Sequence, residues 1–204
     1  MARISKDPEE RKNELLDAAE ELFLTRGFEQ TAVSDIVKKV GVAQGLFYYY
    51  FKSKDEIYNA VMERYLDGIV GIIGQIVNAK GINAPGKIQM IFKEIYNFSK
   101  DKEVLTEYLH REENLPSHFM FAAGMLKKLG PILEKLLEEG NAQGIFNVRY
   151  ASDVTEILLA GLSSYLHDII MVCDEGLYIS KLRVVQDVLE RVLGAEEGTF
   201  EFRL

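Results

Sequence analysis

The sequence lacks the residues on which several common classes of protein depend. Its 204 residues include a single cysteine, Cys173, and no tryptophan, so an internal disulfide framework is excluded. The histidines His110, His118 and His167 form neither an HExxH motif nor a Cys/His cluster, which argues against a zinc site. No P-loop, GxSxG or Rossmann fingerprint occurs. The sequence therefore predicts neither an enzyme nor a bound cofactor.

Long apolar runs are also missing. The uncharged stretches are shorter than the roughly 18 residues that a membrane-spanning helix requires, and residues 1–6 do not resemble a signal peptide. Because 48% of the residues are hydrophobic, the chain has enough apolar material for a core. We expect a soluble cytoplasmic protein with no membrane partner.

The charge distribution is uneven. The formal net charge of −8 argues at first against a nucleic-acid partner, because proteins of that class are typically basic. However, residues 36–54 contain no acidic residue and carry Lys38, Lys39, Lys52 and Lys54. A local basic patch on an acidic body can bind DNA while limiting nonspecific attachment.

Residues 31–54 predict two short helices around a turn. Apolar residues recur at helical spacing from Ser34 to Val40, and Gly41 supplies the permissive backbone that ends this helix. A second helix is predicted from Gln44 to Phe51. This helix-turn-helix pattern is the most specific signal in the chain.

An amphipathic helix precedes this stretch. Asp7-Pro8 can cap and start it, and apolar residues then recur at three- and four-residue steps until about Gly27. Together the three helices predict a DNA-binding domain over residues 1–53.

The second helix of the motif has two distinct sides. Steps of 100° per residue place Phe47, Tyr50 and Phe51 on the core side, Gly45, Tyr48 and Tyr49 on the free side, and Gln44 and Leu46 between them. A tyrosine ring can pack on a thymine methyl group or a sugar while its hydroxyl binds phosphate, and glutamine can bind an adenine edge. Plain core packing is the alternative for the tyrosines, above all for Tyr50.

The stretch GFEQTAVSDIVKKVGVAQGLFYYYFKSKDEIY (27–58) resembles the signature of the tetracycline-repressor (TetR) family of bacterial transcriptional regulators. The shared features are a Gly-aromatic start, a Thr, an Ile-Val pair, a Gly-Val turn, a Tyr-rich recognition helix and Phe-Lys-x-Lys. The resemblance implies that the major groove is contacted by Gln44, Gly45, Leu46, Tyr48 and Tyr49, and backbone phosphates by Thr31, Tyr50 and Lys54.

Two residues depart from this family pattern. Leu46 stands where the family often has threonine, which replaces a polar contact by an apolar one. Ala43 replaces a common serine cap, which weakens the start of the recognition helix by about 1 kcal/mol.

A long helix is predicted from Lys54 to about Val77. It contains Gly68, Gly71 and Gly74, each of which costs about 1 kcal/mol relative to alanine inside a helix. Close packing against a neighbouring helix would explain them. Our hypothesis is instead a hinge that bends when a ligand binds.

Five further helices are predicted, separated by Gly, Pro and Asn signals. Their expected spans are Pro85 to about Ser99, Lys102 to about Glu113, Pro116 to about Glu139, Ala151 to about Asp174, and Tyr178 to about Leu193. Gly130-Pro131 should kink or split the third of them. The predicted fold is all-α, with about nine helices and a second domain, for ligand binding and dimerisation, over residues 54–204.

The last two helices predict a homodimer. The first of them has an uncharged segment with small residues, and the second has apolar residues at a 4-3-4-3 spacing, as in a coiled coil. The predicted interface consists of Leu158, Leu162, Tyr178, Leu182, Val185, Leu189 and Val192. Packing within one chain is the alternative.

Aromatic, methionine and histidine residues of the predicted second domain can line a ligand cavity. The candidates are Phe92, Tyr96, His110, Phe121, Met125, Tyr165 and His167, although ordinary core packing is the alternative for each. The sequence therefore predicts a repressor that binds a palindromic double-stranded DNA operator and is released by a small apolar or amphipathic effector. A DNA-binding adaptor controlled by a protein partner is the alternative.

Overall fold

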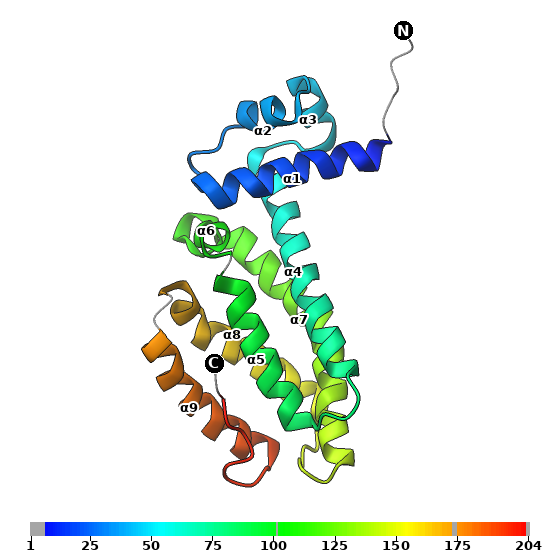
Figure 1. Ribbon diagram of the computed structural model, residues 1–204, viewed down its shortest axis with the longest axis vertical. Coiled ribbons are helices and arrows are strands. Elements are labelled where there is room, and N and C mark those ends of the chain that lie inside the picture. The colour runs from blue at the N-terminus through cyan, green and yellow to red at the C-terminus, as the bar shows by residue number, and fades with distance from the viewer. Residues whose placement is uncertain (1–6, 101, 173–174, 203–204) are drawn as a thin grey trace. The chain divides into compact units, whose positions relative to one another are not determined.

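The protein is built from α-helices. The structure, a computed structural model, describes residues 7–100, 102–172 and 175–202, without the side chains at 103, 167–172, 175 and 178. Over these ranges it contains no β-strand, and its α-helices (Figure 1) are α1 (Pro8–Arg26), α2 (Val33–Val40), α3 (Gln44–Tyr50), α4 (Lys54–Asn78), α5 (Ala84–Lys100), α6 (Glu103–Glu107), α7 (Leu115–Ala142), α8 (Ala151–Val172) and α9 (Glu175–Leu193). The all-α prediction is confirmed.

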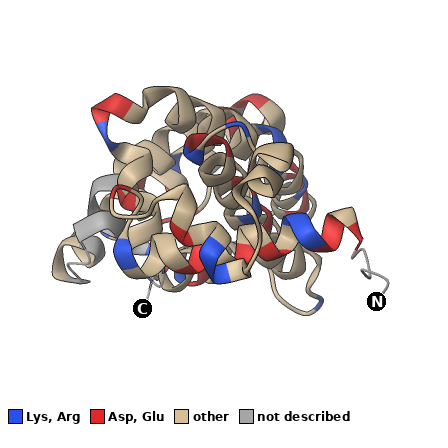
Figure 2. Ribbon diagram, turned by 90° about the horizontal axis from the view of Figure 1, so that it is seen from above, with Lys and Arg blue, Asp and Glu red and all other residues tan. Residues whose placement is uncertain are grey.

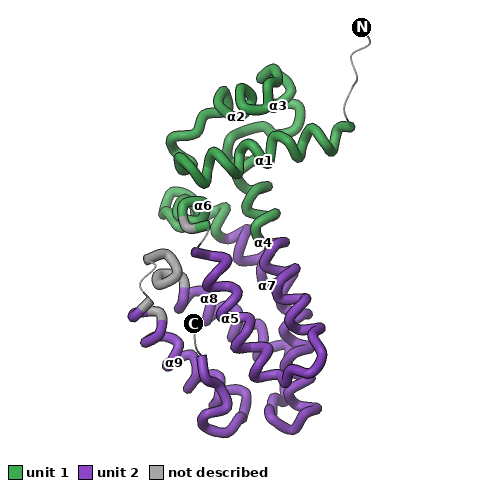
Figure 3. Tube along the Cα trace, viewed as in Figure 1, with its two compact units in different colours: residues 1–65, 102–118 green, residues 66–101, 119–204 purple. Residues whose placement is uncertain are grey.

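The chain divides into two compact units (Figure 3). The head unit comprises residues up to 65 together with 102–118, and the body unit comprises 66–101 and 119–204. Helices α4 and α7 each contribute to both units. The domain boundary expected after residue 53 stays a prediction, because compact units group residues by packing and not by function.

Helix α1 has a side-chain cap at its start and a glycine at its end. The Asp7 carboxylate accepts a hydrogen bond of 2.8 Å from the Glu9 amide, and Pro8 occupies the first turn, where no N–H is needed. At the other end Gly27 has a φ of 81° and donates its N–H to the Phe23 carbonyl. The buried stripe between these ends consists of Leu15, Leu16, Ala18, Ala19, Leu22 and Phe23.

A left-handed glycine makes the turn between α2 and α3. Gly41 has a φ of 74° and a ψ of 36°, a conformation that is strained for a residue with a Cβ atom. At the start of α2 the Asp35 carboxylate accepts a hydrogen bond of 2.9 Å from the Ala32 N–H. The start of α3 has no such bond because the side chain of Ala43 has no acceptor.

The predicted helix from Lys102 to Glu113 is wrong. The segment instead forms the short α6 and two 3-10 turns, η1 (Tyr108–His110) and η2 (Glu112–Asn114). The break falls at Arg111, whose φ of −73° and ψ of 143° are extended. A side chain compensates for the lost helical bonds, because the amide of Asn114 donates to the Tyr108 carbonyl at 3.1 Å.

Gly130-Pro131 was expected to kink or split its helix, and the split is wrong because α7 runs through Pro131; a kink stays a prediction. A proline ring normally clashes with the Cβ atom of the preceding residue, but that residue is Gly130, which has none. Pro131 is also exposed, so its ring needs no space in the core.

The glycines of α4 have different surroundings in the body unit. A Cβ atom on Gly68 would lie 3.0 Å from Cζ of Phe98, a residue of α5. At Gly71 and Gly74 an added Cβ atom would meet nothing within 4 Å. Close packing therefore explains Gly68 but neither of the other two.

The C-terminal end of α7 packs against an aromatic residue. A Cβ atom on Gly140 would lie only 1.9 Å from Cδ2 of Phe146. Phe146 lies beside Phe200 of the segment after α9, with ring centroids 6.1 Å apart. The Glu190 carboxylate holds that segment by accepting hydrogen bonds from the N–H groups of Gly198 and Phe200.

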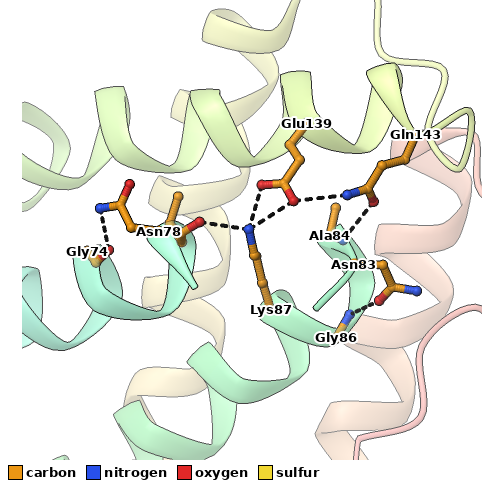
Figure 4. Close-up of polar contacts among 9 residues, drawn as sticks. Gly74, Asn78, Asn83, Ala84, Gly86, Lys87, Glu139 and Gln143 are labelled. Carbon is orange, nitrogen blue, oxygen red and sulfur yellow. Dashed lines mark hydrogen bonds and ion pairs between the residues drawn. The ribbon is translucent and has the colours of Figure 1, made fainter. Parts of the chain in front are cut away.

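A buried lysine joins three helices of the body unit (Figure 4). Lys87 of α5 donates hydrogen bonds to the Val77 carbonyl of α4 and to both carboxylate oxygens of Glu139 of α7, at 2.7, 2.9 and 2.7 Å. Gln143 donates to Glu139 and accepts from the Ala84 N–H, both at 2.9 Å. The buried charge is therefore paired and hydrogen-bonded, as burial in a core requires.

Candidate nucleic-acid interface

Helix α3 separates an exposed aromatic face from a buried one. Tyr49 is 76% exposed and Tyr48 is 52% exposed, whereas Phe47 is fully buried and Phe51 is 3% exposed. Gln44 and Gly45 are exposed, while Leu46 and Tyr50 are half-buried. The predicted core side of the helix is confirmed for Phe47 and Phe51 by their burial, whereas Tyr50, which was predicted on the same side, is only half-buried.

Neighbouring rings brace the exposed tyrosines. The ring of Tyr48 meets Phe47 edge to face, with centroids 5.3 Å apart and an interplanar angle of 85°. Tyr49 meets Tyr50 in the same way at 4.8 Å and 87°. Edge-to-face pairs are favourable beyond simple burial, so the two exposed rings are partly ordered before anything binds them.

The two predicted phosphate contacts outside α3 are engaged within the chain. Thr31 is only 1% exposed, and its hydroxyl donates to the Gly27 carbonyl at 2.8 Å. The ammonium group of Lys54 donates to the Phe28 carbonyl at 2.9 Å and lies 3.9 Å from the centroid of the Phe28 ring. Their contacts with phosphate stay predictions.

Basic residues flank α3. Lys38 and Lys39 are exposed in the last turn of α2, and Lys52 is exposed two residues after the end of α3. Lys39 pairs with Glu21 of α1 at 2.6 Å. The start of α1 has no such excess of basic residues. Figure 2 shows acidic, then basic, then again acidic positions along its first turns, beside the N-terminus. Local positive charge thus accompanies the exposed tyrosines, and Lys38 and Lys52 add phosphate-binding candidates.

An aromatic cluster connects residues 102–118 to the rest of the head unit. Phe28 stacks on Tyr108, with centroids 3.7 Å apart, and both rings meet Tyr58 edge to face. The hydroxyl of Tyr58 donates to the Leu105 carbonyl at 2.9 Å, and burial raises the pKa of Tyr58. Burial, together with the nearby carboxylate of Asp55, also raises the pKa of Tyr108 to about 12.

An ionic network makes a second connection in the head unit. Glu20 of α1 pairs with Lys102 at 2.7 Å and with Arg64 of α4, and Arg64 also pairs with Asp17 at 2.6 Å. Burial opposes ionisation of Glu20, but the hydrogen bonds and charges of Lys102 and Arg64 outweigh burial and lower its pKa. The pKa of Arg64 is raised, because Glu20 and Asp17 outweigh burial there too.

The predicted ligand residues do not form one group. Tyr96 is buried, and Phe92, Phe121, Met125 and Tyr165 are half-buried, all in the body unit. His110 belongs to the head unit, where its Nδ1 lies 2.8 Å from the Thr106 carbonyl oxygen. The side chain of His167 lies outside the described residues. Ligand binding by these residues stays a prediction.

A polar hollow of about 580 Å³ lies at the loop between α4 and α5. It is open to solvent, and its lining includes Asn78, Lys80, Asn83, Lys87 and Glu139. None of the predicted ligand residues lines it. Because Lys87 and Glu139 are already bonded to each other, the hollow offers an apolar effector little to bind.

The predicted dimer residues divide between core and surface. Leu182, Val185 and Leu189 are at most 3% exposed, so the predicted seam of α9 packs within the chain. Leu158 and Leu162 are half-buried, Val192 is 43% exposed, and the side chain of Tyr178 lies outside the described residues.

Another apolar row of α9 is exposed instead. Val184 is 48% exposed and Val188 is 36% exposed, and with Val192 they follow one another at four-residue steps. On α8, Ile157 is 70% exposed. The sequence contains this second apolar row, but its periodicity did not indicate which row faces the core.

The head unit has the arrangement of a helix-turn-helix domain. A supporting helix, a glycine turn and a short helix with outward side chains are the parts that such domains use to place a recognition helix in the major groove. The fold and the site therefore define a helix-turn-helix DNA-binding protein.

Known proteins identify the family. Residues 15–61 match the model of the bacterial regulatory proteins of the tetR family. The HTH-type transcriptional repressor KstR2 of Mycolicibacterium smegmatis is 29% identical over 142 residues, which cover 68% of this chain and 69% of that protein. The uncharacterized HTH-type transcriptional regulator YdgC of Bacillus subtilis is 28% identical over 166 residues, 79% and 81% of the two chains.

The fold extends this similarity over nearly the whole chain. The structure of the fatty acid degradation regulator FadR from Bacillus halodurans matches with a TM-score of 0.64 at 21% identity, covering 93% of this chain and 96% of that one. The helix-turn-helix domain, residues 15–61, therefore belongs to the TetR family. The chain is a DNA-binding transcriptional regulator and not an enzyme. No helix in the described part of the chain has the length and apolarity needed to cross a membrane.

Proposed function

We propose that this regulator is a repressor that binds a palindromic operator as a homodimer and is released by a small apolar or amphipathic effector. The exposed aromatic face of α3 carries the proposal. Tyr49 and Tyr48 hold large rings in water while Phe47 fixes the helix beneath them. Such exposed apolar groups favour a surface that becomes covered on binding.

The chemistry of this face fits the major groove. Gln44, Tyr48 and Tyr49 contact base edges and thymine methyl groups, and Gly45 and Leu46 allow close approach and apolar contact. Thr31, Tyr50 and Lys54 contact backbone phosphates, which fix the register of the head on the duplex. For Thr31 this contact requires its buried hydroxyl to exchange its present bond to Gly27.

The exposed faces of α8 and α9 supply the dimer. Val184, Val188 and Val192 form one apolar row, and Ile157 adds to it from α8. The exposed Ala160, Gly161, Ser163 and Ser164 are small enough to let a helix of the second copy approach. A two-fold pairing places two recognition helices about one helical turn of DNA apart, roughly 34–36 Å, and this requires a palindromic site.

The effector acts through the body unit. A molecule that binds the body better in one conformation shifts the population toward that conformation, by as much as its affinities differ. Helix α4 contributes to both units, and at Gly71 and Gly74 it has low helix propensity and no packing contact for an added methyl group. We place the hinge at these residues.

A protein partner in place of the small molecule is the second candidate. Its support is the exposed pair Phe119 and Met120 on α7, which are 68% and 60% exposed. Large apolar side chains side by side in water favour a docking surface. Substituting both by serine abolishes regulation under this alternative and leaves effector release unchanged under the first proposal.

Selection of bound duplexes from a random DNA pool tests the proposal. We expect an enriched inverted repeat with wild-type protein and none with Tyr49→Ala. Enrichment of no sequence, or of the same sequence by both proteins, would contradict the role given to α3. Enrichment of a single half-site would contradict the dimer.

A further inference from the structure

The ring of Phe28 lies between two groups of the head unit. Tyr108 stacks on it with a centroid separation of 3.7 Å and an interplanar angle of 14°. The ammonium of Lys54 lies 3.9 Å from the same centroid. Two groups this close to one centroid cannot share a face of the ring, so Tyr108 and Lys54 lie on opposite faces.

Phe28 determines where the ammonium of Lys54 lies. The ring attracts the cation through its negative face, and the Phe28 carbonyl accepts a hydrogen bond from Nζ at 2.9 Å. Because a lysine ammonium has three N–H donors, this bond leaves others for a phosphate oxygen. Lys54 is also the first residue of α4, so its backbone is fixed by the helix.

Tyr108 in turn fixes Phe28. It comes from the η1 turn, and its hydroxyl donates to the Asp55 carboxylate at 3.2 Å. Its ring meets the buried ring of Tyr58 edge to face at 5.0 Å. Phe28 is 7% exposed, so a smaller side chain at position 108 would leave space into which its ring can tilt.

We propose that Tyr108 is a positioning residue for DNA binding, which acts through the Phe28 ring to hold the Lys54 ammonium where it meets a backbone phosphate. The inference rests on the proposed function, because it takes the phosphate contact of Lys54 from there. It adds a residue far along the chain that touches no DNA. It also gives the segment 102–118 an indirect influence on DNA affinity, through Phe28 and Lys54.

Salt dependence separates this role from a merely structural one. The affinity of the full-length protein for a short duplex of mixed sequence is measured at several salt concentrations. The slope of log affinity against log salt is negative, and each lost phosphate contact makes it less steep by about 0.9. We expect Lys54→Met and Tyr108→Leu each to reduce the steepness by this amount for every chain bound. The double variant should show the same reduction as either single variant.

Two variants complete the design. Tyr108→Phe keeps the stacked ring and removes only the hydroxyl. It should retain the wild-type slope, which would show that the ring and not the hydroxyl positions Lys54. Val104→Ala changes an exposed residue of the same segment and should also have no effect. If Tyr108→Leu lacks the wild-type helical circular dichroism, Tyr108→Met replaces it, since methionine fills irregular space without a planar ring.

The possible failures are distinguishable. No measurable affinity of the wild-type protein for the duplex at any salt concentration would refute DNA binding itself. A normal wild-type slope that Lys54→Met leaves unchanged would refute the phosphate contact. A salt dependence that becomes less steep in Lys54→Met but not in Tyr108→Leu would refute the positioning role alone. So would a double variant in which the reductions of the two single variants add.

Discussion

Replacing Gly71 and Gly74 by alanine should stiffen α4 and stabilise the protein. An added Cβ atom at either position meets nothing within 4 Å, so only helix propensity changes. Each substitution should raise the free energy of unfolding by about 1 kcal/mol, and the pair should raise it by about 2 kcal/mol. For a chain of this size that corresponds to a rise in melting temperature of about 4–8 °C.

Thermal unfolding followed by circular dichroism at a fixed protein concentration measures this change. Gly68→Ala is the matched control, because its Cβ atom would lie 3.0 Å from the Phe98 ring and steric crowding offsets the gain in propensity. Equal stabilisation by all three substitutions would refute the steric distinction. A loss of stability in Gly71→Ala or Gly74→Ala would show that these positions are not open.

The same pair of substitutions tests the proposed hinge. If α4 bends at these glycines on effector binding, the stiffer helix resists the change and release from DNA weakens, while effector affinity stays largely intact. The measurement is the loss of fluorescence anisotropy of a labelled operator during an effector titration. Unchanged release in a double variant that is measurably more stable would dispose of the hinge.

The other predictions concern packing, ionisation and assembly. Gly140→Ala should destabilise the protein by about 1–3 kcal/mol in denaturant unfolding, since its Cβ atom would lie 1.9 Å from the Phe146 ring; a stabilisation like that of Gly71→Ala would contradict this packing. Glu20, whose pKa is lowered from 4.5, contributes stability that is present above that pH and lost as the pH falls through its folded pKa. Glu20→Gln should therefore unfold more easily than wild type at pH 7 and lose this difference in acid, and parallel pH profiles would contradict the network. Val188→Asp should give a monomer in sedimentation velocity at micromolar concentration, and an unchanged dimer would exclude this face of α9.

The helix-turn-helix domain could be predicted from sequence because its signals are local. The spacing of apolar residues, the glycine at position 41 and the alternation within α3 each depend on a few neighbouring residues. Burial of Phe47 and exposure of Tyr48 and Tyr49 follow from one helical period. Similarly, the cap at Asp7 depends on contacts within one turn.

Other features could not be predicted, for reasons that range from a neighbouring residue to packing between distant segments. The segment after residue 102 has a helical pattern, but contacts of Tyr108 with Phe28 and of Asn114 with the main chain favour a broken form. Helix α7 tolerates Pro131 because of the glycine before it. On α9, two apolar rows are compatible with the same sequence, and only packing within the chain determines that Val185 is buried and Val188 exposed.

The exposed face of α3 binds DNA from within a dimer in the proposed function, and titration of the selected duplex with protein measures both properties. Fluorescence anisotropy at constant salt should give two chains per duplex. For Tyr49→Ala the affinity of the dimer should fall at least tenfold, which corresponds to about 1.4 kcal/mol for the two recognition helices together. The control Tyr150→Ala removes a tyrosine that is 59% exposed in the body unit and should bind as wild type does. Equal affinity of Tyr49→Ala and Tyr150→Ala would contradict the account.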